Sequence, residues 1–142
     1  SMPHAAEMMQ CQPFPDGDLQ DVPVAGGLMH QNFLSRLDFD ISGLAYAICG
    51  GKDLYFVTQS GRFIQAFNYD NGPDYFSKEE GLARYIGKNG LIGFVDRQLN
   101  IVLPARYLAA SPFKSGLARV SYSDDRFTKV DWINVNGQIV FR

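Results

Sequence analysis

The sequence predicts an all-β protein built from about three antiparallel β-meander repeats. A Gly-Leu-Ala string occurs three times, beginning at Gly43, Gly81 and Gly116, so that the copies lie 38 and then 35 residues apart. Short apolar runs alternate with turn residues, and no helical period extends beyond two turns, which favours strands. Phe, Tyr and Trp make up 13% of the chain, a share typical of β-structure. Regular spacing of this kind indicates a repeat architecture.

Three further landmarks recur in the same order as the Gly-Leu-Ala strings. Aromatic strands begin at Phe56, Phe94 and Trp132, at intervals of 38 residues. The next apolar run in each unit is Gly61-Arg62-Phe63-Ile64, Leu99-Asn100-Ile101-Val102 or Gly137-Gln138-Ile139-Val140. An aromatic pair precedes each string: Phe33/Phe39, Tyr69/Phe76 and Tyr107/Phe113. The repeat domain therefore covers residues 33–142 in units of 35–38 residues.

Residues 1–32 are expected to form a Pro-rich N-terminal arm or cap. Their periodicity is weak, and four prolines interrupt them: Pro3, Pro13, Pro15 and Pro23. Ser1-Met2 is interpreted as a tag remnant. One helical turn at most is expected, over residues 33–37.

Each unit is expected to fold as a small meander. In the middle unit the predicted strands are residues 82–86, 91–97 and 100–103. Asn89-Gly90 and Asn136-Gly137 predict type I′ turns, in which both central residues need a positive φ. Pro104 and Pro112 lack an N–H donor and are expected beyond strand ends.

The landmarks resemble the WG repeat family of bacterial proteins. The strings that carry the resemblance are Gly81-Leu82-Ala83-Arg84, Gly93-Phe94-Val95-Asp96, Ile101-Val102-Leu103-Pro104, Tyr107 and Ser111-Pro112-Phe113. The family's Trp-Gly pair is represented here by Gly93-Phe94. The resemblance implies an antiparallel β-repeat fold used as a scaffold or interaction surface. It implies no enzymatic activity.

The basic and aromatic residues of the repeats form the predicted contact set. Arg84 and Arg119 follow successive Gly-Leu-Ala strings, so they are expected on one face. A cationic face would bind an anionic ligand, whereas aspartates such as Asp74 would neutralise it within the fold. Ligand binding and ion pairing within the fold both remain open interpretations at this point. Tyr69, Asp74 and Tyr75 flank or lie in the longest connection, where contact residues are often found.

Cys11 and Cys49 are the only cysteines, which permits one disulfide. They either form that bridge or remain two unrelated thiols, one of them a small buried side chain. A periplasmic or secreted location is preferred to a cytoplasmic one.

No catalytic constellation is recognisable, so the chain is expected not to be an enzyme. Glu79-Glu80 and Asp124-Asp125 are paired carboxylates of the kind a glycosidase uses, but adjacent residues on a strand point to opposite faces. His4 and His30 have no partner in a recognisable catalytic order. No cofactor and no metal site is expected.

The function predicted from these residues is a protein-interaction or scaffold module. The partner would be another protein or a second copy, bound through edge strands and inter-repeat loops. Two alternatives remain: an envelope protein that recognises a glycan or peptidoglycan fragment, and a toxin-immunity protein. The net charge of −2 argues against nucleic acid, and no run is long and apolar enough for a transmembrane segment.

Overall fold

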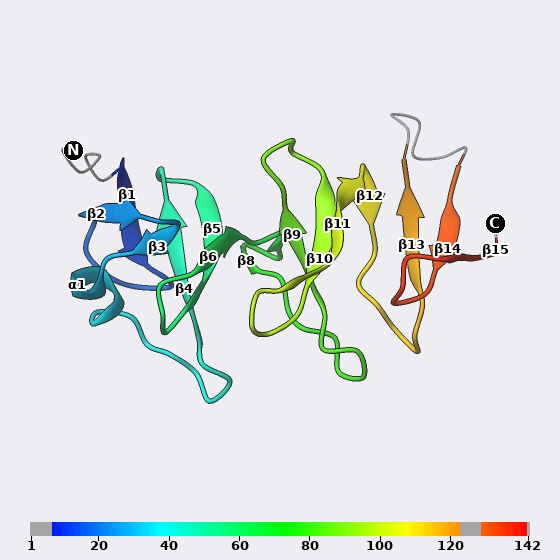
Figure 1. The fold of residues 1–142 in the computed structure, drawn as a ribbon, viewed down its shortest axis with the longest axis horizontal. Coiled ribbons are helices and arrows are strands. Elements are labelled where there is room, and N and C mark those ends of the chain that lie inside the picture. Colours follow the sequence, from blue (N-terminus) through cyan, green and yellow to red (C-terminus); the bar gives the residue numbers. More distant parts are fainter. Residues whose placement is uncertain (1–6, 123–128, 142) are drawn as a thin grey trace. The chain divides into compact units, whose positions relative to one another are not determined.

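A computed structural model describes residues 7–122 and 129–141. Within these residues the regular structure is β-strand apart from one short helix, and the strands pair antiparallel (Figure 1). The predicted all-β repeat fold is thereby confirmed. The chain forms two compact units, Ser1–Ile64 and Gln65–Arg142. The boundary expected after residue 32 falls inside the first unit. Ser1-Met2, the expected tag remnant, lies outside the described residues.

The first unit is organised around a six-stranded sheet with the order β3-β2-β1-β4-β5-β6. Its strands are β1 (Glu7–Pro13), β2 (Gln20–Ala25), β3 (Leu28–Met29), β4 (Leu44–Cys49), β5 (Asp53–Thr58) and β6 (Phe63–Gln65). The helix α1 (Gln31–Leu34) follows β3. Its N-cap is His30, whose Nδ1 accepts a hydrogen bond from the Asn32 N–H at 3.1 Å. The expected single turn thus begins two residues earlier than the sequence indicated, and His30 caps it.

The described part of the N-terminal arm belongs to this sheet. Strand β1 pairs with β2 on one side and with β4 on the other. Cys11 and Val22 are fully buried, and the burial of β1 and β2 alternates along each strand. The prolines conceal this alternation in the sequence, because Pro13 ends β1 and Pro23 lies within β2.

The second unit contains the remaining sheets. A two-stranded hairpin comprises β7 (Asn68–Tyr69) and β8 (Gly72–Pro73). A three-stranded sheet comprises β9 (Ala83–Ile86), β10 (Ile92–Val95) and β11 (Ile101–Tyr107). A four-stranded sheet comprises β12 (Ala109–Ala110), β13 (Ala118–Ser121), β14 (Asp131–Ile133) and β15 (Ile139–Phe141). Each sequence repeat is one meander: β4-β5-β6, β9-β10-β11 and β13-β14-β15.

The second and third meanders share one hydrophobic core. Phe94 of β10 is fully buried, and its ring centroid lies 4.7 Å from that of Phe113 and 6.3 Å from that of Tyr107. Ala118 and Ile133 of the third meander join the same cluster, each with no exposed surface. A single meander cannot bury both faces, so stacking of neighbouring repeats creates this core.

The aromatic strand of every meander ends in the same loop. Thr58, Asp96 and Asn134 occupy its first position. Their side-chain oxygens accept hydrogen bonds from the backbone N–H groups four residues later, which belong to Arg62 (3.1 Å), Asn100 (2.9 Å) and Gln138 (3.0 Å), respectively. Gly61, Leu99 and Gly137 take a positive φ at the fourth position. The 38-residue spacing therefore reflects a shared turn as well as a shared strand.

The type I′ prediction at the two Asn-Gly pairs is wrong. Gly90 and Gly137 have a positive φ of 79° and 77°, but the preceding asparagines do not. The Asn89 Oδ1 instead accepts a hydrogen bond from the Leu91 N–H at 3.0 Å, which stabilises a longer loop closed by the Gly87 N–H and the Leu91 carbonyl. Adjacent positive φ values occur at Asp70 and Asn71, at the tip of the β7–β8 hairpin.

The placement predicted for Pro104 is also wrong, since it lies inside β11. This strand is at the edge of its three-stranded sheet, where a missing N–H donor is tolerated. Its pairing with β10 is irregular between Ile92 and Val95. Pro112 lies between strands, as predicted.

Replacing Gly61 with Ala is expected to destabilise the first unit more than replacing Gly43 with Ala. Both glycines have a positive φ, 97° and 87°, which costs Ala about 1–2 kcal/mol. A Cβ at Gly61 would also lie 2.6 Å from the Met29 carbonyl oxygen, whereas one at Gly43 meets nothing within 4 Å. The extra loss is expected to be at least about 1 kcal/mol. Equal urea midpoints for the two variants would contradict this account.

Candidate functional site

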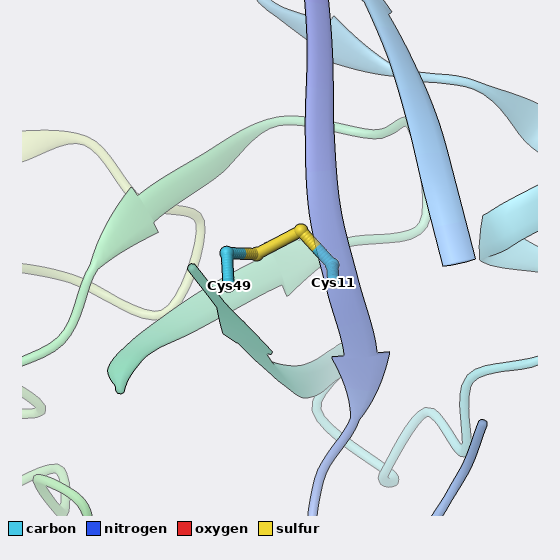
Figure 2. Close-up of a disulfide and its surroundings, with 2 residues drawn as sticks. All are labelled: Cys11 and Cys49. Carbon is cyan, nitrogen blue, oxygen red and sulfur yellow. A yellow bond between two sulfur atoms is a disulfide. The ribbon is translucent and has the colours of Figure 1, made fainter. Parts of the chain in front are cut away.

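Cys11 and Cys49 are joined by a disulfide in the first unit (Figure 2). The two residues face each other in the pairing of β1 with β4. Both are buried, with exposed fractions of 0% and 3%. The bridge therefore fastens the N-terminal strands to the first repeat. Both cysteines belong to the hydrophobic core cluster of this unit, so the buried bridge has a structural role there.

Arg84 and Asp74 form a buried ion pair. The Asp74 carboxylate accepts hydrogen bonds from the Arg84 Nε–H at 2.9 Å, from Nη2–H at 2.8 Å and from the Arg84 backbone N–H at 2.8 Å. The guanidinium also donates from Nη1 to the Ala110 carbonyl oxygen at 2.9 Å and lies 4.0 Å from the Phe67 ring centroid. The exposed fractions of the Arg84 and Asp74 side chains are 6% and 0%. These two predicted contact residues are therefore turned inward.

Tyr69 and Tyr75, in contrast, are accessible. Their exposed fractions are 50% and 46%, and their ring centroids lie 5.2 Å apart in an edge-to-face arrangement. The Asp74 N–H donates to the Phe67 carbonyl oxygen at 2.8 Å, next to the buried ion pair. The ion pair thus anchors the segment that displays the two tyrosines.

Arg119 lies at the position equivalent to Arg84, yet its surroundings differ. It is exposed, and its guanidinium lies 5.6 Å from the Trp132 ring centroid. Its backbone N–H donates to the Ser111 Oγ at 2.8 Å, where Arg84 has the Asp74 carboxylate. The Ser111 hydroxyl therefore takes the position beside Arg119 that the Asp74 carboxylate takes beside Arg84. Within the described residues the structure gives Arg119 no carboxylate partner.

Arg119, Trp132 and Phe141 form a continuous row across β13, β14 and β15, which we call the outer row. Arg119 pairs with Trp132, and Trp132 pairs with Phe141. The Trp132 and Phe141 ring centroids lie 5.3 Å apart. Phe141 is 49% exposed. The opposite face of the same strands holds Ala118 and Ile133, which are fully buried.

Strand β15 is the edge of the four-stranded sheet, at the red end of the chain in Figure 1. Within the described residues it pairs only with β14. Ile139 and Val140 are 42% and 50% exposed. An edge strand with accessible apolar side chains can pair with another strand.

Of the paired carboxylates, Glu80 is hydrogen-bonded within the fold. The Glu80 carboxylate accepts a hydrogen bond from the Gly116 N–H at 2.6 Å. Desolvation by burial raises the pKa of Glu80, but hydrogen bonds from the Gly116 N–H, from Ser77 and from the Glu80 backbone outweigh it and leave the pKa below its ordinary value. Asp124-Asp125 and His4 lie outside the described residues. No group of three or more His, Cys, Asp or Glu side chains in the described ranges is placed to hold a metal ion.

Sequence reasoning missed the outer row as a unit. It identified Arg119 but assigned Trp132 only to the aromatic slot of the repeat. The available signal was the 38-residue spacing, which places Trp132 on Phe94 and Phe141 on Leu103. The spacing does not indicate that the face with Phe94 is covered by other residues and that, among the described residues, the face with Trp132 is not.

The family comparison agrees with the repeat landmarks. The family model described as WG containing repeat matches residues 92–124, from β10 through β13. No curated protein is significantly similar to the chain. The described part of the chain has no helix with the length and apolar character of a membrane span.

Proposed function

We propose that this chain, which carries a WG repeat, is a non-enzymatic β-repeat module that binds a protein partner. The repeats provide a rigid scaffold, and binding takes place at the edge strand β15 and at the hairpin that displays Tyr69 and Tyr75. Extended polypeptide adds to a sheet edge through main-chain hydrogen bonds, while pockets beside the strand select side chains.

The observation that carries this proposal is the exposure of β15. Its three residues, Ile139–Phe141, are all exposed, and it has a β-partner on one side only within the described residues. Exposed apolar side chains next to unpaired backbone groups favour association with a further strand. Tyr69 and Tyr75 add a second apolar contact with polar hydroxyl ends, a residue type favoured in interfaces.

The disulfide supports a periplasmic or secreted location, because such bonds persist in oxidising compartments. A buried bridge between the N-terminal strand and the first repeat suits a small binding module that works outside the reducing cytoplasm.

Photo-crosslinking in the source cells is expected to trap a partner at β15. A photoreactive phenylalanine analogue in place of Val140 should give a discrete crosslinked protein species, because Val140 is half exposed on the edge strand. The same analogue in place of Ile41 is the control, since Ile41 is fully exposed but lies in a loop. Crosslinks at position 140 that do not exceed those at position 41 would refute the proposed function.

A further inference from the structure

We propose that Asn71 is a site of spontaneous chemical modification, at which the side-chain amide is converted to aspartate and isoaspartate. The chain contains three Asn-Gly pairs, which begin at Asn71, Asn89 and Asn136. Because Gly has no Cβ, the backbone nitrogen that follows the asparagine can approach the side-chain amide without hindrance. All three asparagines are exposed, so the folded structure determines which of them reacts.

The reaction needs only water. The Gly72 nitrogen loses its proton and attacks the Asn71 Cγ, the Cγ–Nδ2 bond breaks, and the side-chain nitrogen leaves with that proton as ammonia. A cyclic imide forms, water adds to either of its carbonyl carbons, and the ring opens. Attack at Cγ gives aspartate, whereas attack at the backbone carbonyl carbon gives isoaspartate, in which the chain continues through the side chain. No atom is oxidised or reduced.

Asn71 lies at the tip of the β7–β8 hairpin, where the reacting atoms are weakly held. The hairpin comprises two residue pairs, and one of them contains Pro73, which has no N–H to donate. Both residues of β7 are exposed. Asn71 has a positive φ of 61°, a conformation that is unfavourable for a residue with a Cβ. The tip therefore opens at little cost and lets the Gly72 nitrogen reach the Asn71 amide.

The base of the hairpin is fixed, so opening is confined to the tip. The Asp74 N–H donates to the Phe67 carbonyl oxygen at 2.8 Å. The Asp74 carboxylate is held by Arg84 in the buried ion pair. The reaction at Asn71 thus depends on a local opening of the hairpin, and the rest of the second unit stays folded while it occurs.

Asn89 is held at both ends of its side-chain amide. Its Oδ1 accepts a hydrogen bond from the Leu91 N–H at 3.0 Å, and its Nδ2 donates to the Ala105 carbonyl oxygen at 3.0 Å. The Gly90 N–H, whose nitrogen would attack, donates to the Gly87 carbonyl oxygen at 2.9 Å. These hydrogen bonds must break before the imide can form, which slows the reaction at Asn89.

Asn136 is held through its backbone. Its N–H donates to the Asn134 Oδ1 at 3.0 Å, and the Gly137 N–H donates to the Asn134 carbonyl oxygen at 2.9 Å. The Asn134 Oδ1 also accepts a hydrogen bond from the Gln138 N–H at 3.0 Å. The nitrogen that would attack is therefore fixed within the turn, and Asn136 is expected to react more slowly than Asn71.

The conversion alters the part of the surface where Tyr69 and Tyr75 are exposed. It adds a carboxylate next to Asp70, and isoaspartate also adds a carbon atom to the backbone of the hairpin turn. The tip therefore changes in charge and in shape as the protein ages. The change needs no binding partner, so it is separate from the function proposed above.

Peptide mapping of the full chain measures the three rates separately. Trypsin cleaves after Lys and Arg and places each Asn-Gly pair in its own peptide, residues 63–78, 89–97 and 130–142. The folded protein is incubated in mildly alkaline buffer at physiological temperature, and samples are digested over time. We expect the acid form to accumulate at least about tenfold faster at Asn71 than at Asn89, where two side-chain hydrogen bonds must break. An isoaspartyl methyltransferase should label peptide 63–78.

Unfolding in urea provides the control for the fold. The three rates should become similar there, because the hydrogen bonds that protect Asn89 and Asn136 are absent. Asn71→Gly, which accepts a positive φ, should remove the fast product from peptide 63–78. A rate at Asn71 in the folded protein no higher than at Asn89 or Asn136 would overturn the proposal. Acid formation at Asn68 in place of Asn71, located by fragmentation of the same peptide, would also overturn it.

Discussion

Replacing Asp74 with Ala is expected to lower the free energy of unfolding of the second unit by about 3–5 kcal/mol. The change removes the carboxylate that accepts three hydrogen bonds from Arg84 and leaves a guanidinium with 6% exposure without its counterion. Such a loss is a large part of the stability of a small domain. Urea unfolding followed by the emission of Trp132, which lies in this unit, measures it.

Two controls identify charge burial as the cause. Ser111→Ala removes the corresponding acceptor beside the exposed Arg119 and is expected to cost no more than about 1 kcal/mol. The double variant Asp74→Ala with Arg84→Met removes both charges and should recover part of the lost stability. If Asp74→Ala and Ser111→Ala had similar effects, the ion pair would not have the structural role assigned to it.

Removing the disulfide is expected to destabilise the first unit by about 4 kcal/mol. The bridge joins residues 38 positions apart, and the chain-entropy model gives about this value for a loop of that length. Cys11→Ala combined with Cys49→Ala is the suitable variant, because both sulfur atoms lie in an apolar core and Ala adds no buried hydroxyl. Hydrogen exchange read by mass spectrometry on peptides from residues 7–64 measures the loss separately from the second unit.

A reducing agent provides the matched control for the disulfide. The unmodified chain refolded in dithiothreitol should lose the same protection in residues 7–64, and the double variant should not respond to the reagent. Protection that is the same in the oxidised, reduced and double-variant proteins would contradict a stabilising role for the bridge.

The meanders were predictable from local patterns. The Gly-Leu-Ala strings and the aromatic strands lie at nearly constant intervals, and each pattern became a strand in its expected order. The turn type was less predictable, because Asn89-Gly90 is compatible with more than one hairpin loop, and the Asn89 side chain selected the longer one. Strands β1 and β2 were obscured because prolines interrupt their alternation.

Some of the predicted contact residues are buried and others are exposed, and no local sequence pattern indicates which are which. Arg84 and Arg119 follow the same Gly-Leu-Ala string, but one is buried and the other exposed. Asp74 was grouped with Tyr69 and Tyr75 because all three belong to one connecting region. The backbone then placed its carboxylate inward and the two rings outward.

The sequence by itself determined the repeat, its period and its antiparallel strands, since these depend on side-chain alternation and on turn residues close together in the chain. Only the tertiary structure decided which repeat face is covered. Phe113 stacks on Phe94, the Ala110 carbonyl oxygen accepts a hydrogen bond from Arg84, and the third meander shares this core, whereas the described residues place no such cover on Trp132. Burial depends on contacts between segments distant in the sequence, so identical strings can acquire a structural role in one repeat and an exposed surface in the next.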